Sequence, residues 1–175
     1  GVFDKTREYG LLIDELRDIL HAEKQLIKAL PKMAKAARFD RLRELFEQHL
    51  VETEEQVERL NDCFSLLGET ARAKACKGMM GLVEEGQEVM AEGEEKEDAP
   101  ADLALIGAAQ RVEHYEISGY TTAKNLAQQL RQGAVVALLS KSLAEEENAD
   151  QLLNQVARTL LSVAKMPAPI EQIEG

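Results

Sequence analysis

Two glutamates, Glu113 and Glu116, are the residues of this chain whose types and spacing are best suited to chemistry. If their segment is helical, both side chains lie on one face, because residues at i and i+3 are neighbours on a helix surface. Ile106, Ile117 and Tyr120 share that face, so the pattern points the two carboxylates toward a core. Buried carboxylates are costly unless they are protonated, paired with cations or bound to metal.

Three further predicted helices carry polar residues in the middle of an apolar stripe. The first helix places Glu23 among leucines and isoleucines, and the last has Glu146 at its centre. The second helix is apolar at both ends, with His49 and Glu52 between them. If the stripes pack together, these side chains meet at one level of the core. The predicted metal ligands are therefore Glu23, His49, Glu52, Glu113, Glu116 and Glu146.

Five carboxylates and one imidazole are a donor set for two metal ions. Hard oxygen donors with a borderline nitrogen donor favour iron or manganese, and carboxylates of this kind bridge metal pairs in helical bundles. The nearest basic residues on the last two helices, Lys124 and Lys141, do not fall on the apolar stripes. The sequence therefore predicts two iron ions as the cofactor, with manganese as the alternative.

Some polar residues near the centre could have a structural role instead of binding metal directly. His49 could be a hydrogen-bonded core histidine instead of a ligand, and Gln56 and Asp150 fit a role in orienting ligands. The two tyrosines beside the glutamate pair are expected to pack in the core, and the two remaining histidines to lie at the surface or an interface. These four residues are Tyr115, Tyr120, His21 and His114.

Four long helices must position these side chains. The abundance of Ala, Leu, Glu, Lys and Gln, with only 4% aromatic residues, favours helix over sheet. Apolar periodicity predicts helices over about 6–37, 40–67, 102–130 and 134–165. We expect Pro31 to kink the first helix, Asp40 to cap the second, Gly68 to close it and the segment 166–169 to stop the fourth.

The connections between these helices are short, long and short. The long one contains an amphipathic stretch at about 76–91, which predicts a short additional helix, and an acidic run at 92–98, which predicts an exposed loop. A four-helix bundle with one long crossover is the ferritin-like topology. We therefore predict an all-α protein with a single ferritin-like domain over residues 1–175.

Charge and composition exclude several classes of partner. A formal net charge of −11 argues against binding to nucleic acid or to anionic membranes. No apolar run reaches transmembrane length, and the first eight residues do not read as a signal peptide, so a cytoplasmic location is expected. Cys63 and Cys76 are too far apart for a paired metal clip and are expected to be buried, reduced thiols.

A family resemblance spans about residues 8–165. It is carried by the strings DILHAEKQLIKALPKMAKAA, FEQHLVETEEQVERL, QRVEHYEISGY and SLAEEENADQLL. Together they resemble the YciF-like bacterial stress proteins, a branch of the ferritin-like superfamily related in fold to rubrerythrin. The resemblance implies a four-helix bundle with an extra short helix, a homodimer and a dinuclear metal centre. The carboxylates that the resemblance implies for this metal centre are those of Glu23, Glu52, Glu113, Glu116 and Glu146.

The chain departs from the usual ferritin-like pattern at two histidines. Typical di-iron sites of this superfamily carry Glu-x-x-His on two helices, whereas here Glu52 is followed by Glu55 and Glu146 by Ala149. His49 lies one turn before Glu52, so a reversed order could restore one nitrogen ligand. The departure weakens the case for oxygen activation more than the case for metal binding.

Two classes of function are consistent with these features. The first is a stress-associated di-iron protein that performs redox chemistry on iron, peroxide or oxygen. It would need an external electron donor, because the chain lacks the paired cysteines of a rubredoxin module. The second is a metal-stabilised structural or interaction homodimer without catalytic turnover. Iron storage in a large cage is a weaker third hypothesis.

Overall fold

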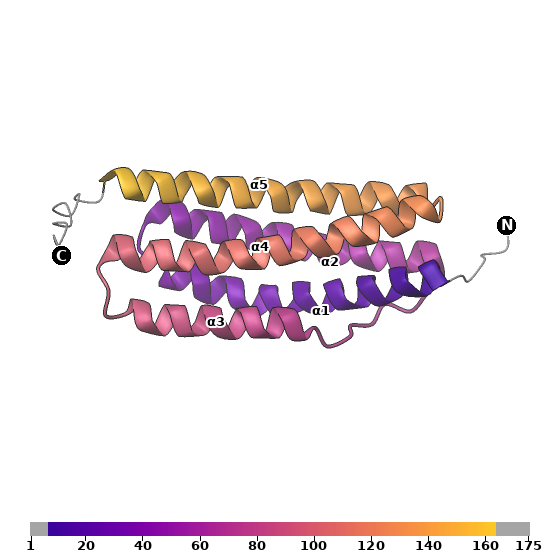
Figure 1. Ribbon diagram of the computed structural model, residues 1–175, viewed down its shortest axis with the longest axis horizontal. Coiled ribbons are helices and arrows are strands. Elements are labelled where there is room, and N and C mark those ends of the chain that lie inside the picture. Colours follow the sequence, from indigo (N-terminus) through magenta and orange to yellow (C-terminus); the bar gives the residue numbers. More distant parts are fainter. Residues whose placement is uncertain (1–6, 164–175) are drawn as a thin grey trace, which may run out of the picture.

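A computed structural model describes residues 7–163, and these residues form five α-helices without a strand (Figure 1). The all-α prediction is thereby confirmed. Predicted helix ends at residues 6 and 165, and the predicted stop at 166–169, lie outside the described residues. In chain order the helices are α1 (Arg7–Ala36), α2 (Asp40–Leu67), α3 (Lys77–Gly93), α4 (Asp98–Gln129) and α5 (Gly133–Val163).

Four long helices run side by side along the molecule, and α3 lies outside them against α4 and α1 (Figure 1). Within the bundle, α1 packs on α2 and α4, and α5 packs on α4 and α2. The connection that contains α3 returns the chain along the bundle, so α2 and α4 run in the same direction (Figure 1). This is the bundle with one long crossover that the sequence predicts.

Most helix ends lie within a few residues of the prediction. α2 ends where Gly68 adopts a left-handed φ of 70°, and the N–H of Gly68 donates to Ser65 O. α1 continues through Pro31 to Ala36, and the kink at this proline stays a prediction. α4 starts at Asp98, four residues earlier than expected, because Pro100 falls in its first turn, where a helix does not need the missing N–H.

The turn between α1 and α2 is stabilised by a distant residue and not by the local cap that the sequence suggests. Asp40 is the first residue of α2, and the N-cap is Phe39, which makes no side-chain capping bond. The buried carboxylate of Asp102 on α4 accepts instead from the backbone N–H groups of Phe39, at 2.9 Å, and Arg38, at 3.0 Å. The prediction of Asp40 as N-cap was therefore wrong.

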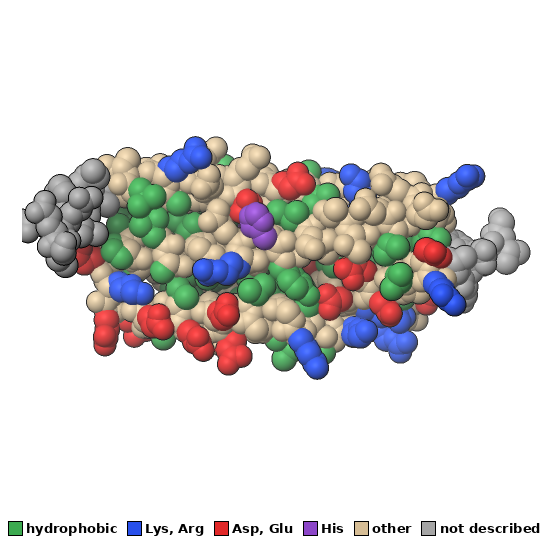
Figure 2. Space-filling view, in the orientation of Figure 1, with side chains coloured by type: hydrophobic (Ala, Val, Ile, Leu, Met, Phe, Trp, Pro, Cys, Tyr) green, Lys and Arg blue, Asp and Glu red, His purple; other side chains and the backbone are tan. Residues whose placement is uncertain are grey.

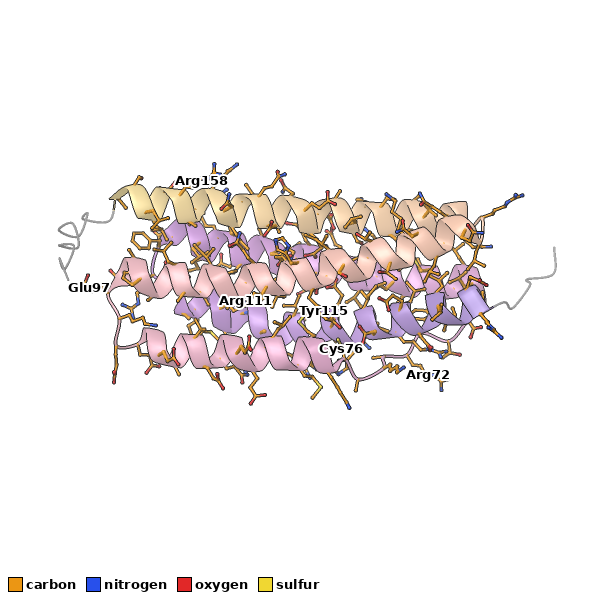
Figure 3. The ribbon with its side chains drawn as sticks, in the orientation of Figure 1. Arg72, Cys76, Glu97, Arg111, Tyr115 and Arg158 are labelled. Atoms are coloured by element: carbon orange, nitrogen blue, oxygen red, sulfur yellow. The ribbon has the colours of Figure 1, made fainter. Side chains whose placement is uncertain are left out.

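The start of α3 is anchored to the bundle by a cluster of polar contacts (Figure 3). The backbone N–H of Cys76 donates to His21 Nδ1 at 2.9 Å, and its thiol lies 2.9 Å from the hydroxyl of Tyr115. That hydroxyl donates to Asp18 at 3.1 Å. A Cβ at Gly78 would lie 2.5 Å from the Tyr115 ring, so the ring needs glycine there. His21, expected at the surface or at an interface, is half-buried at this junction.

The outer face of α3 and the loop after it are acidic (Figure 2). Glu84, Glu85, Glu88 and Glu92 are exposed on the helix, and residues 94–97 form an exposed loop before α4. The acidic loop thus begins two residues later than predicted, because Glu92 and Gly93 still belong to α3. Both cysteines are buried and free, as expected. None of the described helices is long and apolar enough to cross a membrane.

The apolar core is divided into two clusters by a polar layer. Leu26, Phe46 and Leu153 belong to one cluster, and Leu16 and Phe64 to the other. The division follows from the pattern that the sequence shows on the second helix, with apolar ends and a polar centre. Each cluster packs residues from all four long helices, so the polar layer is enclosed on both sides along the bundle axis.

Candidate metal centre

Five polar side chains from the four long helices meet in the layer between the apolar clusters. Glu23 comes from α1, His49 from α2, Glu113 and Glu116 from α4, and Glu146 from α5. Each has an exposed fraction of 5% or less. Helical periodicity accounts for the arrangement locally, because each residue continues the apolar stripe of its own helix. The packing of the four stripes then brings the five side chains together.

The five residues form two groups that could each hold a metal ion. His49, Glu113 and Glu146 form the first, which we call the histidine triad. Glu23, Glu116 and Glu146 form the second, which we call the carboxylate triad. Within each triad, one potential ligand atom from each residue lies within 4.8 Å of the others. Glu146 belongs to both, so its carboxylate would be able to contact an ion in either triad.

The histidine triad is held by close contacts. His49 Nε2 lies 3.0 Å from Glu113 Oε1 and 3.4 Å from Glu146 Oε2. Burial by itself lowers the pKa of His49, but its contacts with Glu113 and with the ionised Glu146 outweigh burial and raise this pKa well above its usual value. Without metal, the imidazole therefore carries a proton and a positive charge.

The four buried glutamates differ in their protonation. Burial, with the charge of Glu146 next, raises the pKa values of Glu113 and Glu116 well above the usual range. Burial also raises the pKa of Glu23 to about 7. Burial opposes ionisation of Glu146 too, but the charge of His49 and the nearby carboxyl groups of Glu113 and Glu116 lower its pKa to about 2. Glu146 is therefore the negative partner of the protonated His49 in the metal-free core.

Several polar atoms of the cluster are buried without a hydrogen-bond partner. They are both carboxylate oxygens of Glu116, both of Glu146, Glu23 Oε1, Glu113 Oε2 and the two ring nitrogens of His49. Such atoms are uncommon in folded proteins, and each carries a desolvation cost. Six of these eight atoms are carboxylate oxygens, the donors that iron and manganese accept. The donor set and its unpaired atoms fit a pair of such ions.

Glu52, the sixth predicted ligand, lies outside both triads. It is half-buried on α2, three residues after His49, and lines a cavity together with His49 and Glu113. Burial, as the largest cause, raises its pKa. Its role as a ligand stays a prediction, which would require its carboxylate to move toward the histidine triad.

A buried arginine beside the centre was missed by the sequence analysis. Arg59 on α2 is 9% exposed and donates to Glu145 Oε2 at 3.1 Å and to Ser142 Oγ at 3.2 Å. Gln56 Nε2 donates to the same Glu145 at 3.2 Å. The only sequence signal was the position of Arg59 one turn after Gln56 on the inward stripe. Because Glu145 precedes Glu146, this network links α2 to the segment that carries the shared glutamate.

The two tyrosines near the glutamate pair have different surroundings. Tyr120 is fully buried, as expected, and its hydroxyl donates to Glu23 Oε2 at 3.1 Å. It can therefore orient one carboxylate of the carboxylate triad. Tyr115 points instead toward the start of α3, where its hydroxyl contacts the N-cap residue Cys76 and also Asp18 on α1 (Figure 3).

Asp150 was expected to orient a ligand, but its contacts lie elsewhere. Its carboxylate accepts from Gln110 at 3.3 Å and lies 3.1 Å from His114 Nε2. The side chain of His114 is 65% exposed, as expected for a residue one position after Glu113. Asp150 therefore joins α5 to α4 on the outside of the bundle. Gln56 is buried in the bundle, but its side-chain amide donates to Glu145 and not to a triad residue.

Comparison with known proteins places the chain in a family. Residues 8–164 match the model of DUF892, a domain of unknown function. The chain is 42% identical to protein YciF of Escherichia coli strain K12 over 154 residues, which cover 87% of this chain and 91% of YciF.

Solved structures agree with this assignment. The crystal structure of the E. coli stress protein YciF is 36% identical, with a TM-score of 0.87 over 91% of this chain and 99% of that one. YcfI from Rhodopseudomonas palustris is 39% identical, with a TM-score of 0.82 over 88% of this chain and 97% of that one. A protein from Xanthomonas campestris, at 21% identity and a TM-score of 0.67, shares the fold. The chain therefore belongs to the DUF892 family and is a relative of the stress protein YciF.

Proposed function

We propose that the two triads form a dinuclear metal centre, with iron as the metal and manganese as the alternative. The observation that carries the proposal is the pair of buried three-residue groups that share Glu146. Its second support is the set of buried carboxylate oxygens without hydrogen-bond partners. A stress-associated role follows from the similarity to YciF.

Metal binding to this centre is coupled to the release of protons. Metal ligands must be deprotonated, whereas burial leaves Glu113 and Glu116 protonated in the metal-free core and the neighbouring charges leave His49 protonated. Loss of these protons would free the side chains of Glu113, Glu116 and His49 to hold two divalent ions. The affinity for metal therefore increases with pH over the range in which these groups titrate.

The residues around the ligands determine how the centre can be used. Tyr120 holds Glu23 by a hydrogen bond, and the two apolar clusters exclude water along the bundle axis. Iron held in such a site supplies one-electron redox chemistry, which suits reduction of peroxide or oxygen, or oxidation of ferrous iron. Turnover with peroxide or oxygen would take its electrons from an external donor.

Metal content tests the proposal most directly. The wild-type protein, purified without chelator or affinity metal, is compared with a variant that carries both E113A and E146A. We expect close to two iron or manganese ions per chain in the wild type and loss of both in the variant. E147Q is the matched control, because Glu147 is the exposed neighbour of Glu146. A folded wild-type protein that holds no metal, even after anaerobic loading, would contradict the proposal.

Redox activity needs a separate measurement. The ferrous-loaded protein is mixed with peroxide in a stopped-flow instrument, and iron oxidation is followed by absorbance. Oxidation faster than that of free ferrous iron supports the redox function. An equal rate contradicts it, even if two ions are bound.

A second candidate function is a metal-stabilised structural homodimer without turnover. The observation that favours it is the absence of both usual Glu-x-x-His histidines, since Glu55 and Ala149 stand in their places. The relative YcfI carries the provisional description of a structural protein. This function predicts a dimer at micromolar concentration in sedimentation, higher thermal stability with metal and no oxidation of ferrous iron above the free rate.

A further inference from the structure

A small apolar cavity adjoins one of the two triads. Its volume is about 30 Å³, and His49 and Glu113 of the histidine triad form its polar inner wall. Neither Glu23 nor Glu116 lines it, so it does not reach the carboxylate triad. All four long helices supply the apolar part of the wall, including Leu26, Phe46, Ala109, Val112 and Leu153.

The rim of the cavity lies between α2 and α5. Gln48 is exposed there, and Glu52, Ala149 and Leu152 are half-buried. From the rim inward, the lining residues thus become less exposed, and the innermost of them include the buried His49. A molecule that enters between these two helices reaches the histidine triad along the edge of the apolar cluster that contains Leu26, Phe46 and Leu153.

The cavity coincides with the missing histidine of α5. Ala149 follows Glu146 by three positions, so both lie on one face of the helix. A ferritin-like site with Glu-x-x-His would carry an imidazole at this position. Here the side chain is a methyl group that lines the cavity. The departure from the usual pattern therefore removes a ligand and leaves open space on the same side of the centre.

The size and lining of the cavity select its ligand. A volume of about 30 Å³ has room for one or two water-sized atoms. The mainly apolar wall disfavours ions, which would lose their hydration, and Glu52 at the rim disfavours anions. A neutral diatomic molecule meets both conditions, whereas an organic substrate is too large.

We propose that this cavity admits a neutral diatomic gas, of the size of dioxygen, to the metal position of the histidine triad and not to that of the carboxylate triad. The inference rests on the proposed dinuclear centre. It makes the two metal positions inequivalent, because one faces a cavity while Glu23 of the other is covered by Tyr120. The space beside Ala149 would give such a molecule access to an ion held by His49 and Glu113.

Xenon tests the cavity without any metal. Crystals of the metal-free protein are pressurised with xenon, and the same is done for A149L and for A144L. Leucine at position 149 fills the cavity, whereas Ala144 is exposed on the same helix and serves as the matched control. We expect a xenon peak beside His49 in the wild type and A144L, and none in A149L. No peak in the wild type, or an unchanged peak in A149L, would overturn the proposal.

Nitric oxide tests access to the metal. Ferrous-loaded protein is titrated with nitric oxide, and the iron–nitrosyl signal is followed by electron paramagnetic resonance. We expect one nitric oxide per two irons in the wild type and A144L, and at least a tenfold weaker affinity in A149L with two irons still bound. Equal binding by both irons, or unchanged affinity in A149L, would contradict the inference. Failure of the protein to load metal contradicts the proposed function instead, and the xenon result still decides on the cavity.

Discussion

The two triads share Glu146 but have different surroundings. The histidine triad contains a charged pair, His49 and Glu146, and faces an apolar cavity. The carboxylate triad contains only glutamates, and its Glu23 is covered by the hydroxyl of the buried Tyr120. The comparison shows that two sets of ligands in one polar layer can differ in charge, in access and in the support of their side chains. Variants that act on one triad at a time can test this difference.

The largest effect is expected from E146Q, because Glu146 is the one residue common to both triads. The amide cannot bridge two ions as a carboxylate does. Both metals should be lost, with a fall in affinity greater than the roughly 10- to 100-fold typical of residues that only orient ligands. Metal analysis after dialysis and competition with a chromophoric chelator measure the change. Retention of both ions at wild-type affinity would show that Glu146 is not shared.

The next largest effects are expected from two variants that each remove a ligand of one triad only. H49Q should remove the ion of the histidine triad, while E23Q should remove that of the carboxylate triad, so each variant is expected to bind one ion per chain. Only E23Q should still bind nitric oxide, because the cavity adjoins His49 and Glu113. Metal analysis and paramagnetic resonance on the same samples give both results. The same residual ligand binding in the two variants would contradict the difference in access.

A smaller effect is expected on the stability of the metal-free protein as a function of pH. The pKa of Glu23 is about 7 in the fold and near its ordinary value of 4.5 in the unfolded chain. Between these values the folded state binds more protons, so stability decreases as pH rises. The loss attributable to Glu23 is about 3 kcal/mol, complete above about pH 7 and absent below about pH 4.5.

Urea unfolding of the chelator-treated protein between pH 4.5 and 8 measures this loss. E23Q provides the comparison, because an amide does not titrate. Its stability should decrease less over the same pH range than that of the wild type. Parallel pH profiles for the two proteins would contradict the assignment of the raised pKa to Glu23.

The smallest effect is expected from Y120F, which removes the hydroxyl that contacts Glu23 and keeps the buried ring. The metal-free protein should lose about 1 kcal/mol of stability, the usual contribution of one hydrogen bond. The ion of the carboxylate triad should bind roughly tenfold more weakly, and that of the histidine triad should change less. A two-phase metal titration measures both affinities. Y115F is the matched control, since Tyr115 contacts α3 and not a triad residue.

The sequence predicted the parts of this protein that depend on periodicity within single helices. Glu113 and Glu116 are three residues apart, and Glu23 and Glu146 each interrupt an apolar stripe. Because the rotation per residue of a helix is constant, these positions point inward wherever the helix packs by its stripe. Gly68 likewise marked the end of α2, since a left-handed residue is most easily adopted by glycine.

The sequence could not predict which polar residues of a stripe would face each other. His49 and Glu52 are both near the inward face, yet only His49 enters a triad. Residues three apart on a helix differ in direction by about 60°, so the placement of the neighbouring helices decides which one is enclosed. Arg59 enters the core for a similar reason, because Glu145 on α5 provides an ionic partner that the sequence of α2 does not reveal.

Contacts between distant segments were decided by tertiary structure alone. The carboxylate of Asp102 accepts from the backbone before α2, and His21 accepts from the backbone before α3. The cavity beside His49 belongs to the same class. The sequence shows that Ala149 stands where a histidine ligand is usual. Whether the space beside Ala149 would be occupied depended on how side chains from four helices pack around it. Local periodicity thus determined the inward positions, and packing between helices determined which of them meet and what space remains.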